Sequence, residues 1–163
     1  MKPRLKYTEV SPGGYRAMSG LEDYARSSGF ESSLLELVKV RASQINGCAY
    51  CIDMHTKDAR ARGETEQRLY ALNAWRETPF FTDRERAALA WTEAVTRVSE
   101  THVPDDVYEQ ASKQFREKEL VDLTLAVIAI NGWNRLAISF RTVPGTYQPA
   151  QHDTKESSRS KVA

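Results

Sequence analysis

The 163-residue sequence lacks several features that mark particular classes of protein. It has only two cysteines, Cys48 and Cys51, which stand three positions apart. It also has no excess of one charge, since 23 basic residues balance 22 acidic ones to a formal net charge of +1. Such a balance creates no large electric field that would attract nucleic acid or anionic lipid. We therefore expect small molecules or proteins as partners, and no nucleic acid.

Long uninterrupted apolar runs are missing as well. The most apolar stretch, residues 120–138, contains polar side chains that would be costly in hydrocarbon, so it predicts a buried core helix and no membrane span. The first ten residues include basic ones but have no apolar segment behind them, unlike a secretory signal. We expect a cytoplasmic protein. A standing structural disulfide is not favoured there, so the cysteines are expected to be reactive or metal-bound.

Alternating β-branched runs of strand length are absent, whereas helix start and stop signals recur, and the sequence predicts an all-α fold. With 40% hydrophobic and 28% charged residues, the composition is that of one water-soluble domain. We expect an N-terminal segment at 1–14, a helical domain at 15–147 and a disordered polar tail at 148–163.

Glycine, proline and capping residues separate the predicted helices. These helices span residues 15–27, 31–45, 48–62, 65–75, a segment that opens at Thr82, 105–115 and 120–141. The part before residue 15 is predicted to be a loop, because Pro12 and the two glycines after it are breakers. Thr82 and Glu85 fit a capping box, and Asp105 is expected to cap the helix that follows Pro104.

The two cysteines open one of these helices, just after Asn46-Gly47. Unpaired amide groups and the positive end of the helix dipole favour a thiolate there. The two-residue spacer lets the sulfurs come within bonding distance, so the second can capture an oxidised first one. His55 follows Cys51 by four residues and projects from the same face, where its imidazole can reach the sulfur directly or through one water. This Cys-His pair predicts nucleophilic chemistry.

Glu36 lies on the preceding predicted helix and can meet His55 if the two helices pack through that face. A carboxylate there would orient the imidazole and hold its proton. Alternatively, Glu36 is the last residue of a capping box opened by Ser33. Spacing alone leaves both interpretations open.

A metal site is a second interpretation of the cysteine pair. The two cysteines with His55 and an acidic residue could bind zinc, although a second Cys/His pair at suitable spacing is missing. Taken alone, His55 is also consistent with an ordinary core or surface histidine. Tyr50, between the cysteines, is interpreted as a packing residue or pocket wall.

Residues 36–55, which read ELVKVRASQINGCAYCIDMH, closely resemble the core motif of the alkyl hydroperoxidase D-like (AhpD-like) proteins of the carboxymuconolactone decarboxylase superfamily. The match combines a glutamate, a twelve-residue step to the first cysteine, the CxxC and the histidine. Residues 130–135, INGWNR, followed by Phe140-Arg141, resemble the last helix of single-domain members. The resemblance covers most of the chain.

This resemblance implies an AhpD-like helical bundle that assembles into trimers or hexamers, with the CxxC at the start of a central helix. It implies a dithiol peroxidase activity without bound metal, haem or flavin. Carried onto this chain, Cys51 is the peroxidatic thiolate, Cys48 the resolving thiol, and His55 with Glu36 the proton relay. The implied substrate is an organic hydroperoxide, and the implied reductant is an external dithiol, either a lipoyl group or a thioredoxin-like protein. In one departure, Tyr50 stands where the best-studied members have a second histidine.

Three other functions are consistent with the same residues. The dithiol could chiefly exchange disulfides in other proteins, or a lyase similar to carboxymuconolactone decarboxylase could act through His55 and Glu36. The decarboxylases resemble this sequence less, because they lack the cysteine pair. In a third interpretation, the chain is a non-catalytic assembly module whose cysteines bind zinc or pack.

Overall fold

Helices account for all the regular structure in the computed structural model, which describes residues 2–149 and has no strand in that range. The predicted all-α fold is thereby confirmed. The elements are α1 (Tyr7–Val10), α2 (Pro12–Ser27), α3 (Ser32–Asn46), α4 (Ala49–Ala61), α5 (Glu66–Ala71), the 3₁₀ helix η1 (Leu72–Glu77), α6 (Asp83–Thr96), α7 (Val98–Thr101), α8 (Asp105–Gln114) and α9 (Glu117–Phe140). The tail predicted from residue 148 lies, apart from 148 and 149, outside the described residues.

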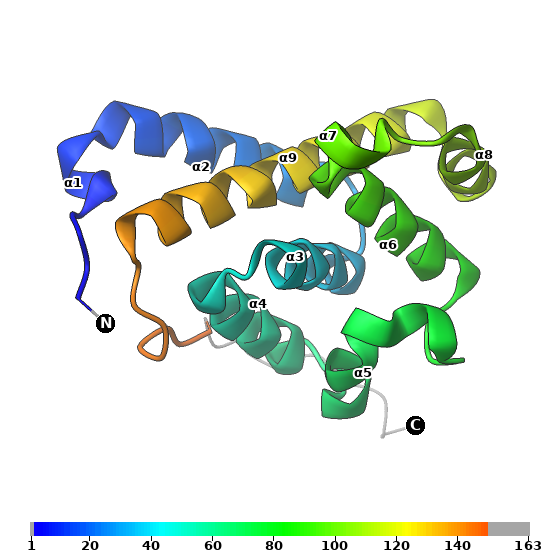
Figure 1. The fold of residues 1–163 in the computed structure, drawn as a ribbon, viewed down its shortest axis with the longest axis horizontal. Helices are drawn as coiled ribbons and strands as arrows, with labels where there is room; N and C mark the ends of the chain where they lie inside the picture. The colour runs from blue at the N-terminus through cyan, green and yellow to red at the C-terminus, as the bar shows by residue number, and fades with distance from the viewer. Residues whose placement is uncertain (1, 150–163) are drawn as a thin grey trace, which may run out of the picture.

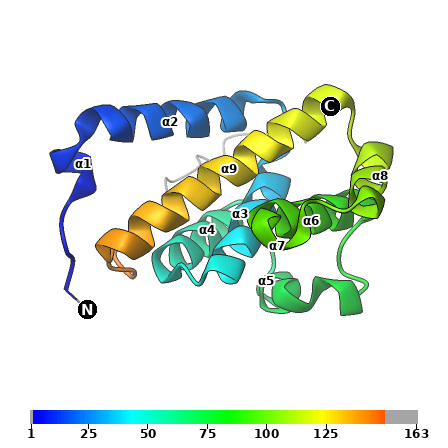
Figure 2. The same cartoon turned by 45° about the horizontal axis from the view of Figure 1, so that its top comes forward.

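Helix α3 is the centre of the fold. It packs against α4, α6 and α9. Helix α2 runs alongside α9, on the side of α9 opposite to α3 (Figure 1; Figure 2). The sequence of α3 explains its position, since a helix that is apolar on most sides is stable only when neighbours cover it on most sides. Burial extends beyond the stripe of Leu34, Leu37 and Val38 to Leu35 and Val40. The site helix α4 is therefore anchored directly on the core.

The N-terminal part is more helical than the sequence predicts. α2 begins at Pro12, and α1 precedes it, so the loop predicted before residue 15 is wrong. Proline fits the first turn of a helix, because the N–H that it lacks would have no partner there. The two glycines that follow Pro12 are helical residues of α2.

Other boundaries are confirmed or corrected. The capping box of Thr82 and Glu85 opens α6 as predicted. Asp105 is the first residue of α8 and does not cap it, because Pro104 occupies the capping position. The helix predicted at 65–75 is divided into α5 and η1. α9 starts at Glu117, before the predicted residue 120.

Helix α9 is the only element of the described part that is long and apolar enough, by length and composition, to cross a membrane. In the fold it contacts α2, α3 and α6, and residues along its length are buried, among them Leu123, Val127 and Ile130. This packing is that of the predicted core helix.

Candidate active site

A tight turn between α3 and α4 places the cysteine pair. Gly47 has a φ of 67°, a left-handed conformation that glycine adopts without a steric penalty. The Cys48 amide donates to the carbonyl of Ser43 at 3.0 Å, which closes the turn. Cys48 is then the N-cap of α4, and its Sγ accepts from the amide of Cys51 at 3.4 Å. Both cysteines thus lie at the positive end of the α4 dipole.

The two sulfurs are joined in a disulfide, with the Cα atoms 5.4 Å apart. The side chains occupy the interior next to α9, and Cys48 and Cys51 are only 1% and 2% exposed. The bonded sulfurs lie at the start of α4, since Cys48 is its N-cap and Cys51 belongs to its first turn. This oxidised form has no thiolate to bind zinc through the cysteines.

A partly buried amide network holds this turn against α9. The Nδ2 of Asn46, the last residue of α3, donates to Oδ1 of Asn131 at 3.0 Å and to Oδ1 of Asn134 at 2.8 Å. Asn134 in turn donates to Ser43 Oγ at 3.1 Å. Since amides can donate and accept at once, the network satisfies buried polar groups of both helices. It joins the two sequence segments that carry the family resemblance.

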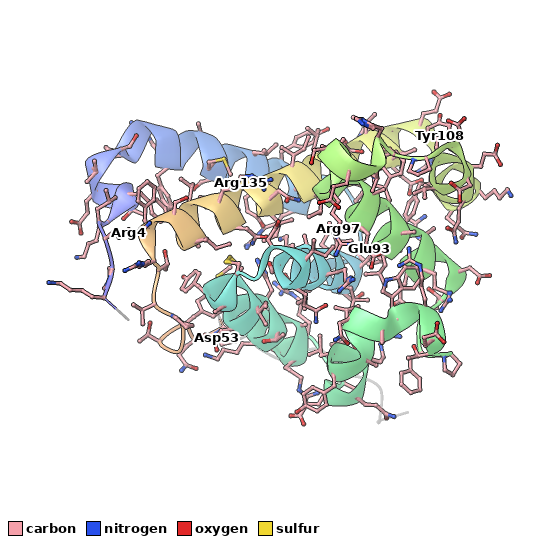
Figure 3. All side chains as sticks on the ribbon, in the orientation of Figure 1. Arg4, Asp53, Glu93, Arg97, Tyr108 and Arg135 are labelled. Carbon is pink, nitrogen blue, oxygen red and sulfur yellow. A yellow bond between two sulfur atoms is a disulfide. The ribbon has the colours of Figure 1, made fainter. Side chains whose placement is uncertain are left out.

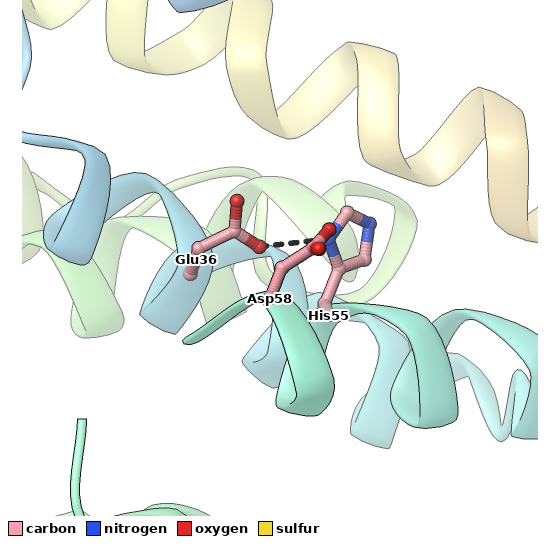
Figure 4. Close-up of side chains that lie close together, drawn as sticks. All are labelled: Glu36, His55 and Asp58. Carbon is pink, nitrogen blue, oxygen red and sulfur yellow. Dashed lines mark hydrogen bonds and ion pairs between the residues drawn. The ribbon is translucent and has the colours of Figure 1, made fainter. Parts of the chain in front are cut away.

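His55 and Glu36 meet between α4 and α3. The Nδ1 of His55 lies 2.8 Å from Oε2 of Glu36, and the residues are 2% and 3% exposed (Figure 4). The other carboxylate oxygen, Oε1, accepts from Nη1 of Arg62 at 3.0 Å. The alternative that Glu36 completes a capping box with Ser33 is wrong, because Glu31 is the N-cap of α3 and makes no side-chain cap.

The surroundings of Glu36 keep it ionised. Burial by itself would raise the pKa of this carboxyl group, but the hydrogen bond with His55 and the positive charges of Lys39 and Arg62 outweigh it and hold the pKa below its usual value. A carboxylate that faces Nδ1 fixes the imidazole so that Nε2 is turned away from it. Within residues 2–149, Nε2 has no hydrogen-bond partner, yet it is not among the fully buried atoms that lack one. Nε2 therefore faces the cavity that His55 lines.

That cavity has a volume of about 260 Å³ and lies between α2, α4 and α9. Cys51 and His55 both line it, whereas Cys48 does not. Within the described part, no hydrogen bond joins His55 to either sulfur, so the direct contact allowed by the spacing is not formed in the disulfide state. Aromatic side chains form much of the wall, namely Tyr7, Tyr15, Tyr50 and Trp133. Tyr50 is thus a pocket wall, as predicted, and burial raises its pKa, so it is a neutral phenol near pH 7.

A buried ion pair that the sequence analysis missed borders the cavity. Lys39 is 1% exposed and its Nζ donates to Oε1 of Glu22, which also accepts from Nε of Arg26 at 2.9 Å. Burial would raise the pKa of Glu22, but these two cations lower it below its usual value. The available signal was Lys39 itself, a lysine between the apolar residues Val38 and Val40.

Residues 12–94 match the family model described as the carboxymuconolactone decarboxylase family. The chain belongs to this family. Together with the cysteine, histidine and glutamate geometry, its structural neighbours identify it as an AhpD-like member. Over 139 residues it is 45% identical to the uncharacterized protein YdfG of Bacillus subtilis (strain 168), a match that covers 85% of this chain and 95% of YdfG.

Two solved structures show how far the AhpD-like fold extends. ATU0492 of Agrobacterium tumefaciens, a protein of unknown function with a suggested identity as the antioxidant defence protein AhpD, is 44% identical with a TM-score of 0.87, over 90% of this chain and all 100% of that one. The debrominase Bmp8, solved as a variant in complex with 2,3,4-tribromopyrrole, has a TM-score of 0.76 over 85% of this chain and 74% of its own. At 17% identity, Bmp8 shows a shared fold alone.

Asp58 is a second buried acid beside His55, and the sequence did not point to it. Its ligand atoms and those of Glu36 and His55 all lie within 4.8 Å of one another, a spacing that suits a cation. All three side chains are already hydrogen bonded, however, since Asp58 Oδ1 accepts from the hydroxyl of Tyr147 at 2.7 Å. The guanidinium of Arg62 adds a positive charge beside Glu36, and this charge disfavours a bound metal ion.

Proposed function

We propose that this AhpD-like chain is a thiol-dependent peroxidase that reduces organic hydroperoxides through a dithiol/disulfide cycle of Cys48 and Cys51. The observation that carries the proposal is that Cys51 and His55 line one cavity, while Glu36 holds Nδ1 of His55 at 2.8 Å. A cavity of about 260 Å³ that combines aromatic walls with the charged side chains of Glu22, Asp23 and Arg26 suits a small molecule with an apolar part and a polar group. Since Cys51 itself is only 2% exposed, its burial favours a small hydroperoxide over a protein disulfide as the oxidant.

In the first step, the thiolate of Cys51 attacks the distal oxygen of the hydroperoxide. An S–O bond forms, the O–O bond breaks, and the departing alkoxide takes a proton from His55, which Glu36 orients. An alcohol leaves and Cys51 becomes a sulfenic acid. The lining of the cavity supports Cys51 as the attacking residue, because Cys48 does not reach it.

In the second step, the sulfur of Cys48 displaces hydroxide from the sulfenic acid, and the hydroxide leaves as water. The product is the Cys48–Cys51 disulfide, the state that the structure contains. An external dithiol then returns two electrons and two protons and becomes a disulfide itself. Because both sulfurs are buried, we favour a slender lipoyl arm as this dithiol over the flat surface of a thioredoxin-like protein. A cytoplasmic location and assembly into a trimer or hexamer are parts of the same proposal.

The test is peroxide consumption with a dithiol donor. Wild-type protein should turn over cumene hydroperoxide, and Cys51→Ser should fall to the rate of buffer with donor. Equal rates for the two proteins would overturn the proposal.

The same assay separates the other functions. A general disulfide oxidoreductase would reduce a protein disulfide faster than it consumes cumene hydroperoxide. A lyase that acts through His55 and Glu36 would keep its turnover in the Cys48→Ser/Cys51→Ser variant. A zinc module would carry stoichiometric metal in its reduced form.

A further inference from the structure

The segment that follows α9 is fastened along α4, close to the site. The amide of Gly145 donates to Oδ2 of Asp53 at 2.9 Å, and Nζ of Lys57 donates to the carbonyl of Tyr147 at 3.1 Å. The hydroxyl of Tyr147 donates to Oδ1 of Asp58 at 2.7 Å. Figure 3 shows Asp53 on the side of α4 where this segment passes. The first two bonds hold the backbone, and the third reaches into the buried polar cluster.

Asp58 is a second acid beside the proposed relay. It is 6% exposed, stands three residues after His55 on α4, and lies with it next to Glu36 of α3 (Figure 4). The ligand atoms of the three side chains are within 4.8 Å of one another. An imidazole Nδ1–H donates to one strong acceptor at a time. A second buried carboxylate thus lies within 4.8 Å of an imidazole that can donate through Nδ1 to only one carboxylate, and among the described residues only Glu36 is hydrogen bonded to that nitrogen.

We infer that Tyr147 is a positioning residue for the relay: its hydroxyl occupies Asp58 and so leaves Nδ1 of His55 to Glu36. The inference deepens the proposed function and rests on it for its effect on turnover. The phenol suits the task, because burial and the bond to Asp58 raise the pKa of Tyr147 to about 12, so it stays a donor through neutral and mildly alkaline pH.

The charged groups around Asp58 let us predict the effect of removing the Tyr147 hydroxyl. Arg26 faces the cluster from α2, Glu36 and Lys39 belong to α3, and Arg62 follows α4. Asp58 would then hold a free acceptor beside several donors, His55 among them. A buried carboxylate without a partner is costly, so it would compete with Glu36 for the imidazole.

The test is a double-mutant cycle of Tyr147→Phe and Asp58→Asn with two readouts. The first is the pair of imidazole ¹⁵N chemical shifts of His55, assigned by comparison with His55→Gln, which needs no turnover. The second is kcat/KM for cumene hydroperoxide. Tyr147→Phe alone should move the His55 shifts and lower kcat/KM about tenfold, the order expected for one misdirected charge-assisted hydrogen bond. In the Asp58→Asn background, the same change should move neither, because asparagine does not compete as an anion.

Two controls separate the hydroxyl from general effects. Tyr70→Phe removes a hydroxyl that donates to Glu66 at 3.2 Å on the surface, from a tyrosine that is 75% exposed. Lys57→Met removes one of the two bonds that hold the backbone of this segment and keeps the Tyr147 hydroxyl, so it should change both readouts less than Tyr147→Phe does. Tyr70→Phe should match the wild type in both readouts.

Several results would overturn the inference. These are unchanged His55 shifts in Tyr147→Phe, an equal effect of that change in the Asp58→Asn background, or the same effect in Lys57→Met. If Tyr147→Phe does not fold, Asp58→Asn decides, since removal of the competing acid should leave the His55 shifts in their wild-type pattern, and a large movement contradicts the inference. If neither the wild type nor any variant turns over peroxide, the proposed function fails. The ¹⁵N chemical shifts of His55 then still test the role of Tyr147.

Discussion

His55 Nδ1 and Glu36 Oε2 lie 2.8 Å apart, although 19 positions separate the two residues in the sequence. Both side chains are buried, so water screens their interaction little, and it is stronger than at the surface. The other nitrogen of the ring faces the cavity that Cys51 lines. In the proposed mechanism, the pair therefore connects a fixed negative charge in the core to the place where the departing alkoxide takes its proton.

Glu36→Gln should lower kcat/KM for hydroperoxide by about tenfold or more, and His55→Gln by about 100-fold or more, because positioned proton transfer contributes factors of that order. Glutamine keeps the shape of Glu36 and removes the charge that holds the proton on His55. Glu31→Gln, at the exposed start of α3, is the matched control and should keep wild-type kinetics. Wild-type kinetics in Glu36→Gln would rule out the relay.

The pH profile should show that Glu36 is ionised over the working range. Its pKa is lowered from 4.5, so its charge, and the activity that depends on it, is present above that pH and is lost only as the pH falls through the lowered pKa. Between about pH 5 and 8, Glu36 should add no acid limb to kcat/KM. Below pH 4.5, protonation of Glu36 should cause an acid limb in kcat/KM, and this limb should be absent from Glu36→Gln.

Cys48→Ser should still react once with peroxide and then stop. Without the resolving sulfur, the sulfenic acid on Cys51 persists, is open to trapping by dimedone, and is oxidised further by excess peroxide. Intact-mass measurement after one and after many equivalents of hydroperoxide shows both products. A dimedone adduct on Cys48 in Cys51→Ser, formed as fast, would mean that the two roles are reversed.

Asn134→Ala should destabilise the protein by about 2–3 kcal/mol, because it removes the amide that donates to the buried hydroxyl of Ser43 and takes from Asn46 one of its two acceptors. Urea unfolding measures the change. Asn73→Ala, at an exposed asparagine, is the control and should stay within about 0.5 kcal/mol of the wild type. A loss as small as in the control would show that the amide network does not hold α3 to α9.

Glu119 should contribute to acid sensitivity. The backbone amide of Arg116 and the side chains of Arg84 and Arg116 bond its carboxylate and lower the pKa to about 2 from 4.5. Because the folded pKa is the lower one, this stabilisation is complete above pH 4.5 and is lost as the pH falls toward 2. The free energy of unfolding of Glu119→Gln should therefore depend less on pH in that window. Glu117→Gln, at an exposed residue of the same turn, should behave as the wild type.

Much of the fold was predictable from local signals. Gly29, Gly47 and Gly63 follow helices in left-handed conformations, and the capping box at Thr82 marks a helix start. These signals act within one turn, so they can be read without knowledge of the tertiary fold. The segment after Pro12 was wrongly predicted to be a loop, because the two glycines that follow Pro12 are usually helix breakers. They are tolerated in α2, where other elements support the helix.

The candidate site was predictable only in part. The motif of residues 36–55 contains Glu36, the cysteines and His55. The structure places Cys51 and His55 on one cavity wall, with Cys48 bonded to Cys51 and Glu36 hydrogen bonded to His55. Glu22 and Tyr147 were not predictable, since they reach their partners Lys39 and Asp58 across 17 and 89 positions. Such contacts depend on how helices and the segment after α9 pack, and this packing leaves no local pattern in the sequence.

In the proposed cycle, Cys51 reacts with a hydroperoxide, and Cys48 then captures the oxidised sulfur of Cys51. The most direct test mixes fully reduced protein with one equivalent of cumene hydroperoxide, without any donor, and follows thiol content and intact mass over time. The account predicts that both thiols of the wild type disappear as one peroxide is consumed and that the Cys48–Cys51 disulfide forms, while Cys51→Ser keeps its remaining thiol. Wild-type thiols that persist, or a Cys51→Ser protein that consumes peroxide equally fast, would contradict it.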